Sequence, residues 1–143
     1  MKSSLFKPHG TAEVEVSDAI LTVHMHSTWN IEMRDQTSGQ MRGQVTALNA
    51  AGPWGIINYL HDTLVYSEEV FAGSRQDYAA RPPSSRMVAV AFVIEPGAEG
   101  DTLLKHRFET LLEGVITSQV FSDYATARQW MLDCIAAQKG KDS

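Results

Sequence analysis

Met-Val-Ala-Val-Ala-Phe-Val-Ile, the run from Met87 to Ile94, is the stretch that decides the fold. Every position in it is apolar, so neither face of a strand built from it can lie in water. Strands of this kind belong to sheets that carry helices on both faces. Pro82-Pro83 before the run and Pro96-Gly97 after it exclude a helix that continues through it. We therefore expect a buried central strand in an α/β domain.

The chain before this strand alternates between strand-like and helix-like segments. Residues 12–17 alternate apolar and polar side chains, and a short turn separates them from a second run, Ile20–His26. Two such runs joined by a short turn predict an antiparallel hairpin. Apolar residues at helical spacing then span 33–48, and Gly52-Pro53 ends that helix. Trp54–Leu60 is the predicted third strand.

The alternation continues toward the carboxyl terminus. A helix is predicted after Ser67, a second over 104–112, a strand over 117–121 and a last helix capped by Asp123. The expected order is β-β-α-β-α-β-α-β-α. Strands that alternate with helices pair in parallel through right-handed crossovers. We expect an α/β fold with a mixed, mostly parallel five-stranded sheet, an N-terminal hairpin, four βα units and helices that cover the sheet.

Length and composition indicate one globular domain over residues 1–143. Hydrophobic residues make up 43% of the chain and charged residues 20%, values close to those of an ordinary globular domain. Residues 1–7 and 138–143 are short, polar and without pattern, so we expect an ordered core of about 9–137 between loose ends.

Charge and cysteine content exclude several classes of function. The chain carries 12 basic and 17 acidic residues, a net charge of −5, and the basic residues are scattered. This distribution disfavours nucleic acid and anionic lipid headgroups as partners. Cys134 is the single cysteine, which excludes an intrachain disulfide and a multi-cysteine metal site. The first ten residues lack the apolar segment of a signal peptide, and no apolar run is long enough to span a bilayer. We therefore expect a protein of the bacterial cytoplasm.

Three segments carry a resemblance to a known superfamily. They are His9-Gly10, Thr28-Trp29-Asn30-Ile31-Glu32, and residues 120–131, Val-Phe-Ser-Asp-Tyr-Ala-Thr-Ala-Arg-Gln-Trp-Met. With the order of elements, they resemble the SpoIIAA-like fold, which STAS domains share and to which the CRAL-TRIO (Sec14) lipid-binding domains are related. The chain is similar over nearly its whole length to a bacterial family of small stand-alone SpoIIAA-like proteins.

The resemblance implies a regulatory or protein-interaction module without enzymatic activity, acting on a protein partner whose identity the sequence does not give. STAS anti-sigma-factor antagonists carry a phosphorylatable Ser or Thr at the start of the helix after the third strand of this topology. The matching region here holds Ser67, with Thr63 and Asp62 nearby. The family's Asp-Ser-Ser-Gly-like run is missing, and two glutamates follow Ser67. A plain N-cap is the alternative role for Ser67.

The second hypothesis is a carrier or sensor of a small apolar ligand. It rests on the kinship with CRAL-TRIO domains and on methionines at predicted core positions, which could line a cavity. We expect such a pocket at the carboxyl ends of the strands, where open α/β sheets bind ligands. The candidate lining residues are His61, Tyr59, Tyr66 and Trp29.

Histidines provide the remaining candidates. His24 and His26 lie two apart on one strand and so point to the same face, where His61 could join them to hold a metal. Alternatively they face water or bond to neighbours, and since no carboxylate stands at a clear partner spacing we expect neither metal nor cofactor. His61 with Asp62 could act in acid–base catalysis, but no nucleophile motif or phosphate loop accompanies them, so no enzyme is expected. A homodimer is compatible with every one of these functions.

Overall fold

The computed structural model describes residues 11–26, 31–61, 68–95 and 101–142 of the 143. Strands and helices follow one another there in the predicted order. They are β1 (Thr11–Ser17), β2 (Ile20–His26), α1 (Ile31–Ala51), β3 (Trp54–Leu60), α2 (Glu68–Ala79), β4 (Met87–Ile94), α3 (Asp101–Leu111), β5 (Ser118–Phe121) and α4 (Tyr124–Asp142).

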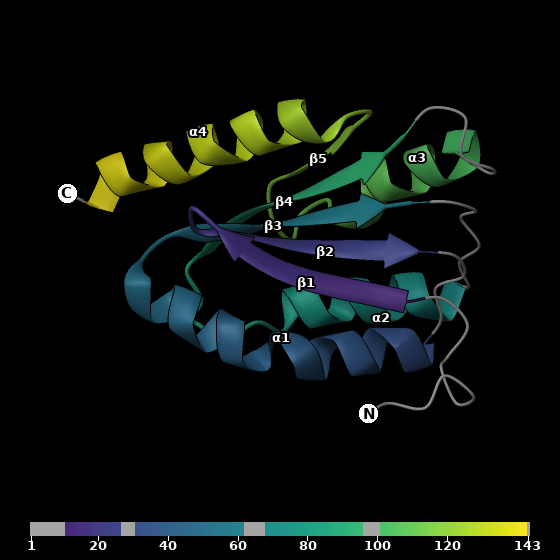
Figure 1. Cartoon of the computed structure of the whole chain (residues 1–143), viewed down its shortest axis with the longest axis horizontal. Coiled ribbons are helices and arrows are strands. Elements are labelled where there is room, and N and C mark those ends of the chain that lie inside the picture. Colours follow the sequence, from purple (N-terminus) through teal and green to yellow (C-terminus); the bar gives the residue numbers. More distant parts are fainter. Residues whose placement is uncertain (1–10, 27–30, 62–67, 96–100, 143) are drawn as a thin grey trace.

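The strands form one sheet in the order β1-β2-β3-β4-β5. β1 runs antiparallel to β2, and the remaining neighbours are parallel, which confirms the mixed, mostly parallel α/β sheet. Each of α1, α2 and α3 joins neighbouring parallel strands in the same direction, so right-handed crossovers place all three on one face. α4 follows the last strand and covers the opposite face (Figure 1).

A tight turn joins β1 to β2. Its two residues, Asp18 and Ala19, have φ angles of 54° and 66°, both in the left-handed region. Two left-handed residues between paired strands form a type I′ turn, whose twist matches that of the strands. Asp adopts this conformation at modest cost, whereas the Cβ of Ala19 is crowded by its own backbone.

Replacing Ala19 by glycine is expected to raise the free energy of unfolding by about 0.5–1 kcal/mol. This is the difference between the backbone strain that glycine relieves and the burial of the methyl group that is lost. Urea unfolding monitored by circular dichroism measures the change. Ala47→Gly, on the exposed side of α1, is the matched control. The same chemical change there is expected to destabilise by about 1 kcal/mol, because glycine weakens a helix interior. A destabilising Ala19→Gly would contradict the strain argument.

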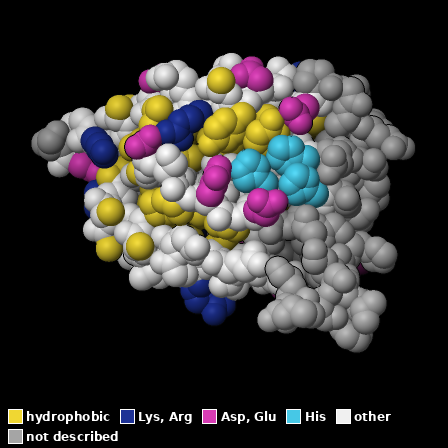
Figure 2. Space-filling model, viewed as in Figure 1, with side chains coloured by type: hydrophobic (Ala, Val, Ile, Leu, Met, Phe, Trp, Pro, Cys, Tyr) yellow, Lys and Arg dark blue, Asp and Glu magenta, His cyan; other side chains and the backbone are white. Residues whose placement is uncertain are grey.

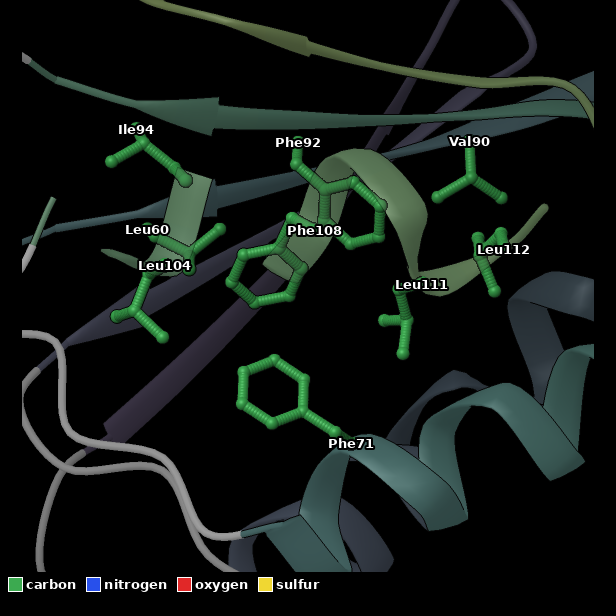
Figure 3. Packing of buried hydrophobic residues seen from close by; sticks show 9 residues of the cluster. All are labelled: Leu60, Phe71, Val90, Phe92, Ile94, Leu104, Phe108, Leu111 and Leu112. Carbon is green, nitrogen blue, oxygen red and sulfur yellow. The ribbon is translucent and has the colours of Figure 1, made fainter. Parts of the chain in front are cut away.

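The core lies on both faces of the sheet. Nine buried side chains pack between the sheet, α2 and α3, and Figure 3 shows them converging around Phe108; they are Leu60, Phe71, Val90, Phe92, Ile94, Leu104, Phe108, Leu111 and Leu112. On the other face, α4 buries Ala127, Met131 and Ile135 against the sheet. The segment from Ala89 to Ile94 in β4 is buried on both faces, as its apolar sequence predicts.

α4 begins as predicted but ends later. Asp123 caps it: its carboxylate accepts hydrogen bonds from the backbone N–H of Thr126 at 2.8 Å and from the Thr126 hydroxyl at 2.9 Å. The prediction that the chain is loose from Gln138 onward was wrong, because the helix continues through Asp142. Gln138 Nε2 donates to Asp142 Oδ1 at 3.1 Å, and two lysines in the last turn favour the negative end of the helix dipole.

Candidate functional site

Three histidines and a tyrosine gather on the sheet face that α4 covers in part. α4 packs on β3, β4 and β5, and its first residues reach β2 through a 3.0 Å hydrogen bond between Tyr124 and Thr22. Beyond that contact, strand alternation brings His24 and His26 of β2 to the same face, and β3 supplies Tyr59 and then His61. We call His24, His26, Tyr59 and His61 the histidine cluster. Figure 2 shows its three imidazoles side by side.

The rings of the cluster contact one another closely. The His61 ring stacks on Tyr59 with 3.9 Å between ring centroids and on His26 with 4.5 Å. His24 Nδ1 lies 3.1 Å from His61 Nε2, within hydrogen-bond distance. The prediction that His24 and His26 share a face and that His61 joins them from the next strand is therefore confirmed as geometry.

Glutamates surround the cluster. Glu15 Oε1 lies 3.2 Å from His24 Nε2, and Glu13 Oε1 lies 3.9 Å from His26 Nε2. Glu95 Oε1 lies 3.7 Å from His61 Nδ1, and Glu95 Oε2 accepts a hydrogen bond from the Tyr59 hydroxyl at 3.0 Å. Burial, the bond to Glu95 and nearby negative charge together raise the pKa of Tyr59 above its usual value. Spacing along the sequence did not indicate these carboxylate partners, which β1 and the residue after β4 supply through strand pairing.

A second candidate site is a cavity between α1, α2 and the opposite face of the sheet. Its volume is about 240 Å³. Its apolar wall consists of Val23, Met25, Met41, Val45, Trp54, Ile56, Pro82 and Met87. We call it the α1–α2 cavity. Short side chains stand where α1 faces the sheet, notably Thr37 and Val45, and this leaves space that leucines at the same positions would fill.

Polar side chains make up the rest of the lining of the α1–α2 cavity; they are Thr37, Ser38, Asn49, Asn58, Ser74, Asp77, Tyr78, Arg81 and Ser85. Thr37 is 5% exposed and Asn58 is 6% exposed, which makes them two of the three buried polar side chains among the described residues. Asn58 Nδ2 donates to the Tyr78 hydroxyl at 3.3 Å. Burial raises the pKa of Tyr78, an effect that the bond from Asn58 partly offsets, so the phenol is neutral at physiological pH. The cavity thus combines an apolar wall with an amide and a phenol, and one acidic and one basic side chain, Asp77 and Arg81, also line it.

One hydrogen-bond arrangement fixes the aromatic wall of the cavity. The indole nitrogen of Trp54 donates to Asn49 Oδ1 at 2.6 Å, and the same oxygen accepts a bond from the backbone N–H of Arg86 at 2.8 Å. Asn49 therefore links α1 to the start of β3 and to the segment before β4. The bond to Asn49 holds the indole of Trp54 in one orientation.

Some of the site residues proposed from the sequence lie in the part of the chain that the structure describes, and others lie outside it. Tyr59 and His61 are brought together in the histidine cluster, but neither lines the α1–α2 cavity, which lies on the other sheet face. The cavity also differs in place from the pocket expected at the carboxyl ends of the strands, because its lining reaches Trp54 and Met87, the first residues of β3 and β4. Ser67, Thr63, Asp62, Tyr66 and Trp29 lie outside the described residues. Sequence reasoning missed Asn58 and Tyr78, although an asparagine inside the apolar strand Trp54–Leu60 was a usable signal.

No protein-family model matches the chain, and no curated protein matches it. Among the described residues, none of the helices combines the length and apolar character needed to cross a membrane. The fold class is thus an α/β domain with a mixed sheet, and the SpoIIAA-like resemblance remains a prediction.

Proposed function

We propose that this chain is a non-enzymatic binding domain that carries or senses a small, mostly apolar molecule in the α1–α2 cavity. The single observation that carries the proposal is the cavity itself, with a volume of about 240 Å³ and three methionines in its wall. This volume is about eight times the volume that one molecule occupies in liquid water. It is smaller than the roughly 300–1,000 Å³ of pockets for drug-sized ligands, which favours a smaller molecule.

The lining supports a ligand with one polar group. Ligand sites are mostly apolar and place a few polar groups that orient the bound molecule. Met25, Met41 and Met87 supply an adaptable wall, since methionine side chains are flexible and polarisable. Asn58 offers an amide oxygen, and Tyr78 offers a neutral hydroxyl. A hydroxyl, amide or carbonyl on an otherwise apolar ligand would match this pair.

The other two hypotheses gain no support from the described residues. A phospho-regulated interaction module would depend on Ser67, Thr63 and Asp62, which lie outside the described part of the chain. An enzyme based on His61 would need Asp62 as well. Both stay predictions from the sequence.

Ligand binding can be tested with N-phenyl-1-naphthylamine, an uncharged apolar fluorescent probe. The native chain is expected to bind one probe molecule and to raise its fluorescence. Val45→Phe places a ring in the space that the probe would occupy. We expect a roughly 10-fold or larger loss of probe affinity, which corresponds to about 1.4 kcal/mol or more of binding free energy.

The matched control is Val16→Phe on β1, where the native side chain is 46% exposed and away from the cavity. It adds the same atoms and should leave probe affinity unchanged. Native mass spectrometry of the gently purified chain then looks for a stoichiometric apolar adduct that is lost on denaturation. Equal probe binding by the native chain and Val45→Phe would refute the proposed site.

A further inference from the structure

The two hydrogen-bonded histidines of the cluster place ring nitrogens toward each other and toward carboxylates. The inner nitrogens are His24 Nδ1 and His61 Nε2, which are 3.1 Å apart. The outer nitrogens face Glu15 at 3.2 Å and Glu95 at 3.7 Å. An ionised carboxylate can only accept a hydrogen bond, so the 3.2 Å contact with Glu15 favours hydrogen on His24 Nε2. Glu95, at 3.7 Å, is too far from His61 Nδ1 for a hydrogen bond and acts on that ring through its charge.

This arrangement determines what the inner nitrogens can bind. A neutral imidazole with hydrogen on its outer nitrogen has a lone pair on the inner one. The His24–His61 hydrogen bond then has His61 Nε2 as donor and His24 Nδ1 as acceptor, and a metal ion that binds both nitrogens takes the place of the shared hydrogen, which is released as a proton. Histidine ligands of metal ions show the same pattern, because the ring nitrogen away from the metal usually donates to a carboxylate or carbonyl.

Distance and charge agree with a metal ion. Zinc–nitrogen bonds measure about 2.0–2.1 Å, so two nitrogens roughly 3.1 Å apart can share one ion with an angle near 100° between the bonds. Three carboxylates, those of Glu13, Glu15 and Glu95, lie within 4 Å of the cluster's imidazole nitrogens and favour a cation. Figure 2 shows acidic side chains directly around the imidazoles.

We propose that His24 and His61 form a binding site for one divalent transition-metal ion of the zinc, copper and nickel class, which imidazole ligands suit. Among the described residues, no group of three His, Cys, Asp or Glu side chains is arranged to hold a metal ion. The ion therefore has two protein ligands there and completes its coordination with water. The site lies on the sheet face opposite the α1–α2 cavity and does not depend on the ligand proposed for that cavity.

Isothermal titration calorimetry of the full chain with zinc chloride at neutral pH tests the site. We expect one ion per chain. His24→Ala and His61→Ala should each weaken binding roughly 10-fold or more, and Glu15→Gln, which alters only the partner of an outer nitrogen, by about 10-fold. His106→Ala is the matched control, because His106 is exposed on α3, and it should bind as the native chain does.

A second measurement needs no variant and so does not depend on how the variants fold. Paramagnetic Co²⁺ added to the native chain is expected to broaden the ring resonances of His24 and His61 in nuclear magnetic resonance spectra, and to spare those of His106. Zinc binding that survives in a folded His24→Ala/His61→Ala double variant would show an adventitious ion elsewhere and overturn the proposal. If His24 and His61 take up a proton on acidification but bind no zinc, the proposed metal site is also overturned.

Discussion

Replacement of Phe108 by alanine is expected to lower the free energy of unfolding by about 3–5 kcal/mol. Phe108 is 5% exposed and lies between two other phenylalanines. Its ring is 4.6 Å from that of Phe92 on β4 and 5.3 Å, edge to face, from that of Phe71 on α2 (Figure 3). The substitution therefore removes both the burial of a large apolar side chain and the contact through which α3 attaches to the sheet and to α2.

Urea unfolding curves measured by tryptophan fluorescence and by circular dichroism give the size of the effect. Phe108→Leu is the matched control, since leucine keeps most of the apolar volume and should cost clearly less than alanine. The slope of the free energy with urea should stay the same in both variants if folding remains two-state. A loss below about 1 kcal/mol for Phe108→Ala would contradict the central position assigned to this ring.

Much of this architecture follows from the sequence because it depends on local periodicity. The all-apolar run Met87–Ile94 required helices on both sides of the sheet, and the structure buries it from Ala89 onward. Ile20–His26 and Trp54–Leu60 form strands with the predicted bounds. Asp123 caps α4 because its carboxylate accepts a hydrogen bond from a backbone N–H in the first turn, which has no partner within the helix. In each case the deciding interaction lies within a few residues along the chain.

The candidate sites depended instead on packing between distant segments. The α1–α2 cavity exists because side chains of α1, α2 and the sheet together leave space, and no single segment encodes that volume. The carboxylates around the histidines come from β1 and from the end of β4, and their position follows from strand register. His24 lies opposite Glu13 in the β1–β2 ladder but contacts Glu15 diagonally. Sequence spacing alone does not specify such diagonal contacts.

Gly55 is the position at which we expect a substitution to have the second large effect on the free energy of unfolding. A Cβ built on Gly55 would clash with the sulfur of Met131 and lie 3.1 Å from the backbone oxygen of Ala89. Met131 is fully buried on α4, so displacing its thioether disturbs the packing between α4 and the sheet. A glycine inside a strand often marks such a close approach of another element. Gly55→Val is therefore expected to lower the free energy of unfolding by about 3 kcal/mol, the upper part of the overpacking range.

Glycine substitution as such does not produce this loss. Gly43 lies on the exposed side of α1, and a Cβ there meets no other atom within 4 Å. Gly43→Ala should raise the free energy of unfolding by about 0.5–1 kcal/mol, because alanine restricts the unfolded chain and favours a helix. If the change in the free energy of unfolding is negative at Gly55 and positive at Gly43, the loss at Gly55 comes from steric exclusion at the sheet and not from the conformational entropy of glycine.

A double-mutant cycle identifies Met131 as the group that excludes a side chain at Gly55. Met131→Ala alone should cost about 2–5 kcal/mol, because it leaves a cavity under α4. In the double variant Gly55→Val/Met131→Ala, the valine occupies part of that cavity, so the combined loss should be smaller than the sum of the single losses. Contacting residues show coupling energies of about 0.5–3 kcal/mol, and a value in the upper half of that range is expected here. Additive losses would mean that the backbone near Ala89, not the thioether of Met131, sets the limit, and that α4 can move away from the sheet without the repacking inferred here.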